Sequence, residues 1–204
     1  RHSVRMPDGM EACRKGDCFS GLLTADAFLE YGRKQGARLA LVNGGAIRAS
    51  LPAGDISRGD LLALHPFDGQ VYVREYSGKQ IMDALEHAVS GPDGEGPQLL
   101  QVAGLAYEAD TSRPAGRRLQ AVHIVDERGR RHVLDPQGRY GVVLSDFLAS
   151  GGDGFGMLRQ GRLLGTSPLS VRELTGDYIR RHSPLTAPRG ERIILNRANG
   201  QSPQ

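Results

Sequence analysis

The stretch 39–48, LALVNGGAIR, decides the fold: a short apolar run ends at Asn43-Gly44-Gly45, and an arginine follows three residues later. An apolar run closed by a turn is typical of a buried strand. Glycines let the backbone approach a ligand closely, and N–H groups left free at a strand end attract anions. Arg48 adds a planar, permanently charged guanidinium. This corner therefore favours anion recognition, and the alternative is an ordinary turn with a solvated Arg48.

The bulk composition is that of a globular protein. The chain has 204 residues, of which 39% are hydrophobic and 24% charged, which suits one large domain or two small ones. The net charge is +3, no basic block dominates, and aromatic residues make up only 5%. No apolar run has the length of a membrane span. We therefore expect no nucleic-acid partner and no membrane span, with a slight preference for small anionic ligands.

Hydrophobic periodicity and turn residues predict the elements in chain order. Ser57 and Asp60 have the spacing of a capping box, and His65-Pro66 should end the helix that they begin. Helices are expected at 18–35, 57–64, 77–89 and 170–182. Strands are expected at 38–42, 70–76, 99–102, 105–108, 119–125, 131–134, 140–144 and 192–196. This order predicts the α+β class, with a mixed β-sheet flanked by helices.

A second glycine-rich corner follows at 145–155, SDFLASGGDGF, where Phe147 and Asp153 accompany Gly151 and Gly152. Phe67 also stands in a loop next to a glycine. Two phenylalanines in such loops can hold a flat ligand between them, because stacking on a base is worth about 1–3 kcal/mol. Asp153 could accept hydrogen bonds from sugar hydroxyls. The alternatives are phenylalanines that fill the core and an aspartate that bonds its own turn.

Catalytic signatures are missing from the sequence. No cluster of histidines and carboxylates has the spacing of a hydrolytic metal pair, and no nucleophile elbow, P-loop or dinucleotide fingerprint is present. Cys13 and Cys18 have no His or further Cys nearby in the sequence that could complete a metal site with them. A disulfide between them, which would indicate an oxidising compartment, is favoured over two free thiols. The residues alone thus predict a ligand-binding domain without catalytic or metal-binding residues.

Four segments resemble the C-terminal domain of the 5′-nucleotidase family, which includes UDP-sugar hydrolases and 2′,3′-cyclic-nucleotide phosphodiesterases. They are LVNGGAIRASLPAGDISRGDLLALHPF, SGKQIMDALEHAVS, LLQVAGLAYEADTSRPAGRRLQAV and SDFLASGGDGFGML, in the family's order. The resemblance covers about Cys13 to Met157. It implies that residues 13–196 form this domain, that 1–12 lead in from a missing N-terminal metallophosphoesterase domain, and that 197–204 are a flexible tail.

The resemblance also implies roles for single residues. Phe67 and Phe147 match the pair that sandwiches the nucleobase, and Asp153 matches the residue that binds the ribose hydroxyls. The residues that match those approaching the substrate and its phosphate are Arg14, Asn43 and Arg48. Some extracellular members carry a disulfide with the spacing of Cys13 and Cys18.

Three short stretches depart from the family's usual pattern. Phe19 stands where Asn is usual, and His65 replaces a common leucine before the Pro-Phe pair. Asp68-Gly69 stands where Gly-Asn or Gly-Gly is common, a difference that bears on base preference.

The implied function is substrate binding in an enzyme that hydrolyses nucleoside monophosphates to nucleoside and phosphate. The catalytic residues and two divalent metal ions are expected on the N-terminal domain, which is the expected partner, so this chain alone should hold no cofactor and be inactive. The expected location is the periplasm, the cell surface or the extracellular space. The alternatives are a stand-alone nucleoside- or nucleotide-binding module without catalysis, and a structural domain whose pocket has lost its function.

Overall fold

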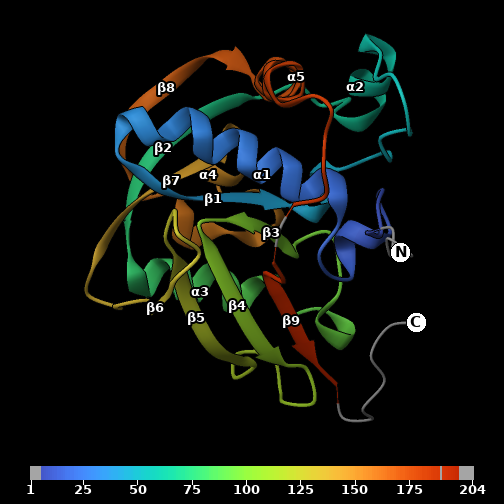
Figure 1. The fold of residues 1–204 in the computed structure, drawn as a ribbon. Helices are drawn as coiled ribbons and strands as arrows, with labels where there is room; N and C mark the ends of the chain where they lie inside the picture. The colour runs from blue at the N-terminus through green and yellow to red at the C-terminus, as the bar shows by residue number, and fades with distance from the viewer. Residues whose placement is uncertain (1–5, 189, 198–204) are drawn as a thin grey trace.

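A five-stranded mixed sheet organises the computed structural model, which describes residues 6–188 and 190–197. Its strand order is β3-β1-β7-β2-β8, in which β1 and β7 are parallel and the other neighbours antiparallel. Figure 1 shows this sheet in the upper part of the molecule. Its strands are β1 (Ala37–Asn43), β2 (Gln70–Ser77), β3 (Leu100–Ala103), β7 (Arg139–Ser145) and β8 (Arg162–Ser170).

A second sheet of four strands, in the order β6-β5-β4-β9, lies below the first in the view of Figure 1. Its strands are β4 (Leu105–Asp110), β5 (Leu119–Val125), β6 (Arg131–Val133) and β9 (Ile193–Asn196). In this sheet β4 and β9 are parallel, while β5 is antiparallel to both of its neighbours. The α+β class predicted from the sequence is confirmed. The strands form two mixed sheets, where the sequence predicted one.

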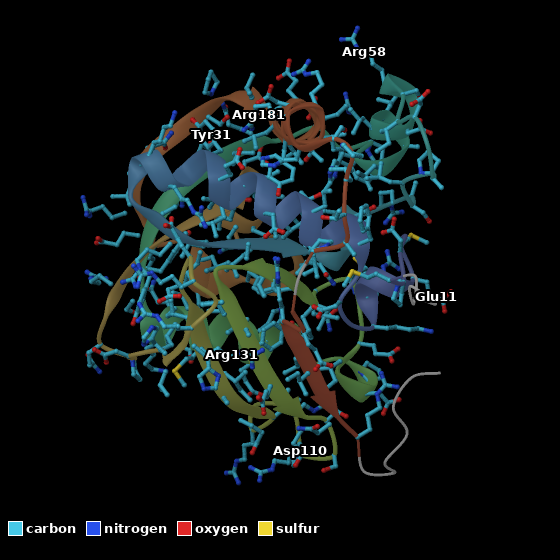
Figure 2. All side chains as sticks on the ribbon, in the orientation of Figure 1. Glu11, Tyr31, Arg58, Asp110, Arg131 and Arg181 are labelled. Atoms are coloured by element: carbon cyan, nitrogen blue, oxygen red, sulfur yellow. A yellow bond between two sulfur atoms is a disulfide. The ribbon has the colours of Figure 1, made fainter. Side chains whose placement is uncertain are left out.

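Helices flank the five-stranded sheet on both faces. The helices are α1 (Phe19–Gly32), α2 (Arg58–Leu64), α3 (Gly78–Ala88), α4 (Asp146–Ala149) and α5 (Val171–His182). α1 packs on β1 and β3, with α5 beside it, whereas α3 contacts β2 and β5 (Figure 1). Arg181 of α5, labelled in Figure 2, pairs with Glu30 of α1. Of the helices in the described ranges, none combines the length and hydrophobicity that crossing a bilayer requires.

The predicted capping box is present and explains where α2 begins. Ser57 accepts a hydrogen bond from the Asp60 backbone N–H, and the Asp60 carboxylate accepts one from the Ser57 N–H. α2 ends at Leu64, as the His65-Pro66 pair predicted. Because such caps satisfy N–H groups that a helix leaves unpaired, they fix the first residue of the helix.

The core divides into two parts, one on each face of the five-stranded sheet. Successive strand residues point to opposite faces, so Leu39 and Leu41 of β1 pack with α3 and the second sheet. Ala40 and Val42 of the same strand pack with Phe28 of α1. Burial on both faces explains why the stretch 39–42 is continuously apolar.

The predicted disulfide between Cys13 and Cys18 is formed and lies at the start of α1, where the Cys18 sulfur accepts a hydrogen bond from the Gly21 N–H. Part of the expected lead-in also packs here. The Asp8 carboxylate accepts bonds from the Ser20 N–H and hydroxyl, both at 2.8 Å. Residues 1–5 of the expected lead-in and 198–204 of the expected tail lie outside the described residues.

The sequence analysis missed β8, the edge strand beside β2. Of its nine residues, Ser167 is the one that is buried, so the strand shows no apolar alternation. Its register with β2 also shifts twice, as at a β-bulge. Pairing with a distant strand, which local sequence does not encode, creates this element.

Candidate functional site

A cavity of about 490 Å³ opens at the edge of the five-stranded sheet where β1 and β7 end. Because these strands are parallel neighbours, the two glycine-rich corners that follow them meet at the same edge. The third wall is the segment 65–69 between α2 and β2. The cavity is lined by all six predicted binding residues: Arg14, Asn43, Arg48, Phe67, Phe147 and Asp153.

The two phenylalanines are exposed rather than buried. The exposed fraction is 74% for Phe67 and 47% for Phe147, which excludes the alternative that they fill the core. The sequence predicted a loop at Phe147, but Phe147 belongs to α4, because Ser145 caps a short helix directly after β7. The Arg48 guanidinium lies 5.8 Å from the centroid of the Phe67 ring, a cation–π distance. Both rings can therefore contact a flat ligand in the cavity.

The glycines of the two corners make room for neighbouring groups. A Cβ on Gly152 would lie 2.5 Å from the nearest atoms of the Phe147 ring, so the ring packs directly on the backbone. A Cβ on Gly44 would lie 2.2 Å from the Cys13 carbonyl oxygen. Gly151 has a φ of +88°, in the left-handed region that favours glycine. Of the four glycines singled out from the sequence, Gly45 lines the cavity, and Gly152 packs against the Phe147 ring that lines it.

The backbone N–H groups of the first corner are not free, which corrects the sequence interpretation. Gly44 donates its hydrogen bond to the Leu99 carbonyl at 2.7 Å, and Gly45 donates to the Pro97 carbonyl at 2.8 Å. The segment that accepts them lies more than fifty residues away in the chain, so the local sequence did not reveal the pairing. Any attraction for an anion must therefore come from side chains.

Arg14 and Arg48 supply that positive charge. Within residues 6–188 and 190–197, no carboxylate lies within 4.0 Å of either guanidinium, whereas other arginines of the chain form ion pairs. The Arg14 Nε atom is buried and has no hydrogen-bond partner in the same described part of the chain. Because an unpaired buried donor is costly, Arg14 is suited to donate a hydrogen bond to an anionic ligand.

Asp153 is oriented by two neighbours. Its backbone has a φ of +50°, an uncommon conformation for a residue with a Cβ. The Asn43 side-chain amide donates a hydrogen bond to Oδ2 of Asp153 at 2.8 Å. The His87 ring contacts the Asp153 carbonyl oxygen at 2.7 Å and packs edge-on against Phe155. In the part of the chain that the structure describes, the carboxylate bonds no backbone group of its own turn, so its second oxygen can accept hydrogen bonds from a ligand.

His65 forms part of the buried floor of the cavity. Its ring Nε2 lies 3.2 Å from the Thr24 hydroxyl and 3.4 Å from the Thr175 hydroxyl. Burial lowers the pKa of His65 to about 4, although a hydrogen bond with the Ala46 backbone partly opposes this effect. His65 is consequently neutral at pH 7 and adds no charge to the cavity.

Several lining residues were not anticipated from the sequence. Asp146 directly precedes Phe147 and accepts a hydrogen bond from its N–H at 2.8 Å. Its position next to Phe147 in the sequence could have indicated that it lines the same cavity. Phe28 and Val171 come from α1 and α5, which reach the cavity only through tertiary packing. Their helical periodicity predicted burial but not proximity to this site.

Comparison with known proteins agrees with the geometry. Residues 4–160 match the family model described as 5′-nucleotidase, C-terminal domain. The chain is 35% identical over 158 residues to the trifunctional nucleotide phosphoesterase protein YfkN of Bacillus subtilis, covering 77% of this chain. It is 32% identical over 198 residues to an apyrase of Tabanus yao, covering 91% of this chain. It spans 11% of the first protein and 36% of the second.

A solved structure also superimposes well. The crystal structure of a 5′-nucleotidase precursor from Thermus thermophilus matches with a TM-score of 0.88 and 35% identity. The match covers 96% of this chain and 38% of that chain. The fold is shared with the Haemophilus influenzae NAD nucleotidase, at a TM-score of 0.79 and 20% identity. The sequence resemblance is thereby confirmed: the chain belongs to the family of 5′-nucleotidase C-terminal domains.

Proposed function

We propose that this domain binds the nucleoside part of a nucleotide for a 5′-nucleotidase-type phosphohydrolase. The observation that carries the proposal is the make-up of one cavity, which is lined by two exposed phenyl rings, Asp153 and two guanidinium groups that have no carboxylate partner among residues 6–188 and 190–197. A nucleotide has a flat base, a diol and an anionic phosphate, so each part of it has a matching partner.

Each side chain has a distinct role in this proposal. Phe67 and Phe147 contact the two faces of the base. The Asp153 carboxylate, held by Asn43, accepts hydrogen bonds from the ribose hydroxyls. A guanidinium donates paired hydrogen bonds to a phosphate, which is the role we assign to Arg48 and to Arg14.

The hydrolytic step is assigned to a part of the longer protein outside this chain, because its relatives extend well beyond the matched region. Divalent metal ions there would polarise the phosphate and activate a water molecule. Within the described residues, the side chains that lie close enough together to share a metal ion are those of Asp8, Cys13 and Cys18. It does not fit a metal, since both sulfurs are in the disulfide. We therefore expect this chain alone to bind without hydrolysing.

The proposed location is the periplasm or the outside of the cell. Disulfides persist in oxidising compartments, and this domain contains one between Cys13 and Cys18. Relatives named as snake venom 5′-nucleotidases, such as that of Gloydius brevicauda at 30% identity over 200 residues, support this proposal.

Titration of the domain with adenosine tests the proposal. Two stacking contacts contribute about 2–6 kcal/mol, and association costs at least about 4 kcal/mol. With the polar contacts added, the dissociation constant should be about high micromolar to millimolar. Amide chemical shifts should show saturable binding that Phe67→Ala weakens and Leu163→Ala, an exposed residue of β8 outside the cavity, does not. Equal affinity in the parent chain and Phe67→Ala would overturn the proposal and favour a structural domain.

A further inference from the structure

We propose that Arg172, on the first turn of α5, is a positioning residue that fixes the orientation of Phe67 for base stacking. The inference rests on the proposed function, because it assigns a residue that supports one of the two stacking rings. Arg172 does not line the cavity, and it lies beyond residues 4–160 that the family model matches. Arg172 would thus contribute to ligand affinity without touching the ligand.

Arg172 contacts the segment 65–68 through every part of its guanidinium. Its Nε and Nη2 atoms donate to the His65 carbonyl oxygen at 3.1 and 2.9 Å. Nη2 also lies 3.4 Å from the Pro66 carbonyl oxygen. Nη1 lies 3.3 Å from Oδ2 of Asp68. The guanidinium therefore bonds to residues on both sides of Phe67.

The backbone at the start of α5 strengthens this contact. The Arg172 N–H donates to Oδ1 of Asp68 at 3.2 Å, and the Val171 N–H donates to the Gly69 carbonyl at 3.0 Å. Asp68 accepts the hydrogen bond at the helix N-terminus, where a negative charge is favourable. The segment 65–69 is thus bonded to α5 at both of its ends.

Phe67 depends on this support because little else holds it. Its side chain is 74% exposed, and its segment belongs to neither a helix nor a strand. In residues 6–188 and 190–197, no other side chain donates a hydrogen bond to the carbonyls of His65 or Pro66. An aromatic ring contributes fully to stacking only when its orientation is set before the ligand arrives.

The geometry requires arginine rather than lysine. Arg172 uses three nitrogen atoms in a fixed plane to reach one carbonyl cluster and one carboxylate together. A lysine has one nitrogen atom and cannot maintain both contacts with that geometry. Arg172→Lys should therefore restore only part of the affinity that Arg172→Ala loses.

The test is a double-mutant cycle in this chain, with adenosine and ribose 5-phosphate as ligands. We expect Phe67→Ala to weaken adenosine binding about 5- to 150-fold, the range for losing one stacking contact. Arg172→Ala should weaken it about fivefold, at the low end of that range, with Arg172→Lys in between. In the Phe67→Ala background, Arg172→Ala should cause no further loss. Ribose 5-phosphate, which has no base, should bind each variant equally.

The control is Arg180→Ala, which removes an exposed arginine from the same helix without touching the segment 65–69. Additive losses from Phe67→Ala and Arg172→Ala, or an equal loss of ribose 5-phosphate binding, would overturn the inference by showing a general structural effect. An unchanged adenosine affinity in Arg172→Ala, alongside a loss in Phe67→Ala, would overturn it while leaving the proposed function intact. If Arg172→Ala does not fold, the same cycle is run with Arg172→Lys.

Discussion

A methyl group added at Gly152 should weaken nucleoside binding by displacing the Phe147 ring. The new Cβ would lie 2.5 Å from the ring, and ordinary contact begins at 3.4 Å, so the exposed ring must retreat by the difference. Gly152 does not have a positive φ, so alanine fits the backbone itself. The displacement is therefore expected in the ring and not in the fold.

The size of the effect follows from what the Phe147 ring contributes. One stacking contact is worth about 1–3 kcal/mol, which is about 5- to 150-fold in the dissociation constant. Gly152→Ala should lose a part of this, and never more than Phe147→Ala. Stability should change little or rise, because Gly→Ala at a compatible site stabilises by about 0.4–1 kcal/mol through the unfolded chain.

Adenosine titrations of the parent chain, Gly152→Ala and Phe147→Ala measure these losses, with thermal unfolding as the check on folding. Gly156→Ala is the matched control, since its Cβ meets nothing within 4 Å. An adenosine affinity of Gly152→Ala that equals that of Gly156→Ala and of the parent chain, while Phe147→Ala loses affinity, would refute the reasoning.

Three further predictions concern stability and ribose recognition. The pKa of His65 is lowered from 6.5 to about 4 in the folded chain, so the unfolded chain binds a proton more readily and stability is lost as pH falls from 6.5 to 4. The expected loss in the free energy of unfolding is about 3 kcal/mol. Urea unfolding should show this loss in the parent chain but not in His65→Gln; a difference in unfolding free energy between the two that stays constant from pH 6.5 to 4 would contradict the prediction. Reducing the Cys13–Cys18 disulfide, which closes a short loop, should cost about 2 kcal/mol in the same assay, and an unchanged midpoint would count against it. Asn43→Ala should weaken binding of adenosine but not of 2′,3′-dideoxyadenosine, because Asn43 acts through Asp153; equal losses for both ligands would exclude this route.

Much of the fold could be predicted because its signals are local. The apolar run before Asn43 is buried on both faces of the sheet, and the Ser57–Asp60 box starts α2 as its spacing predicted. The positions of Phe67 and Phe147 beside glycines left both a stacking pair and core packing open, and the family resemblance predicted the stacking pair. The structure brings both rings to one cavity.

What the sequence did not reveal depends on contacts between distant segments. The N–H groups of Gly44 and Gly45 were predicted to be free, but they donate to carbonyls of the distant segment 97–99. β8 becomes a strand only by pairing with β2, and its position next to that strand brings Arg172 to the Phe67 segment. Periodicity does not encode such pairings, so the support of the site was the hardest part to predict.

The central claim is that a nucleobase lies between Phe67 and Phe147. The chain has only five phenylalanines, so selective labelling makes their ring protons assignable. Nuclear Overhauser effects between the base protons of saturating adenosine and these rings test the claim most directly. We predict effects to both Phe67 and Phe147 and none to the buried Phe155. Saturable binding without contact to either exposed ring would contradict the account.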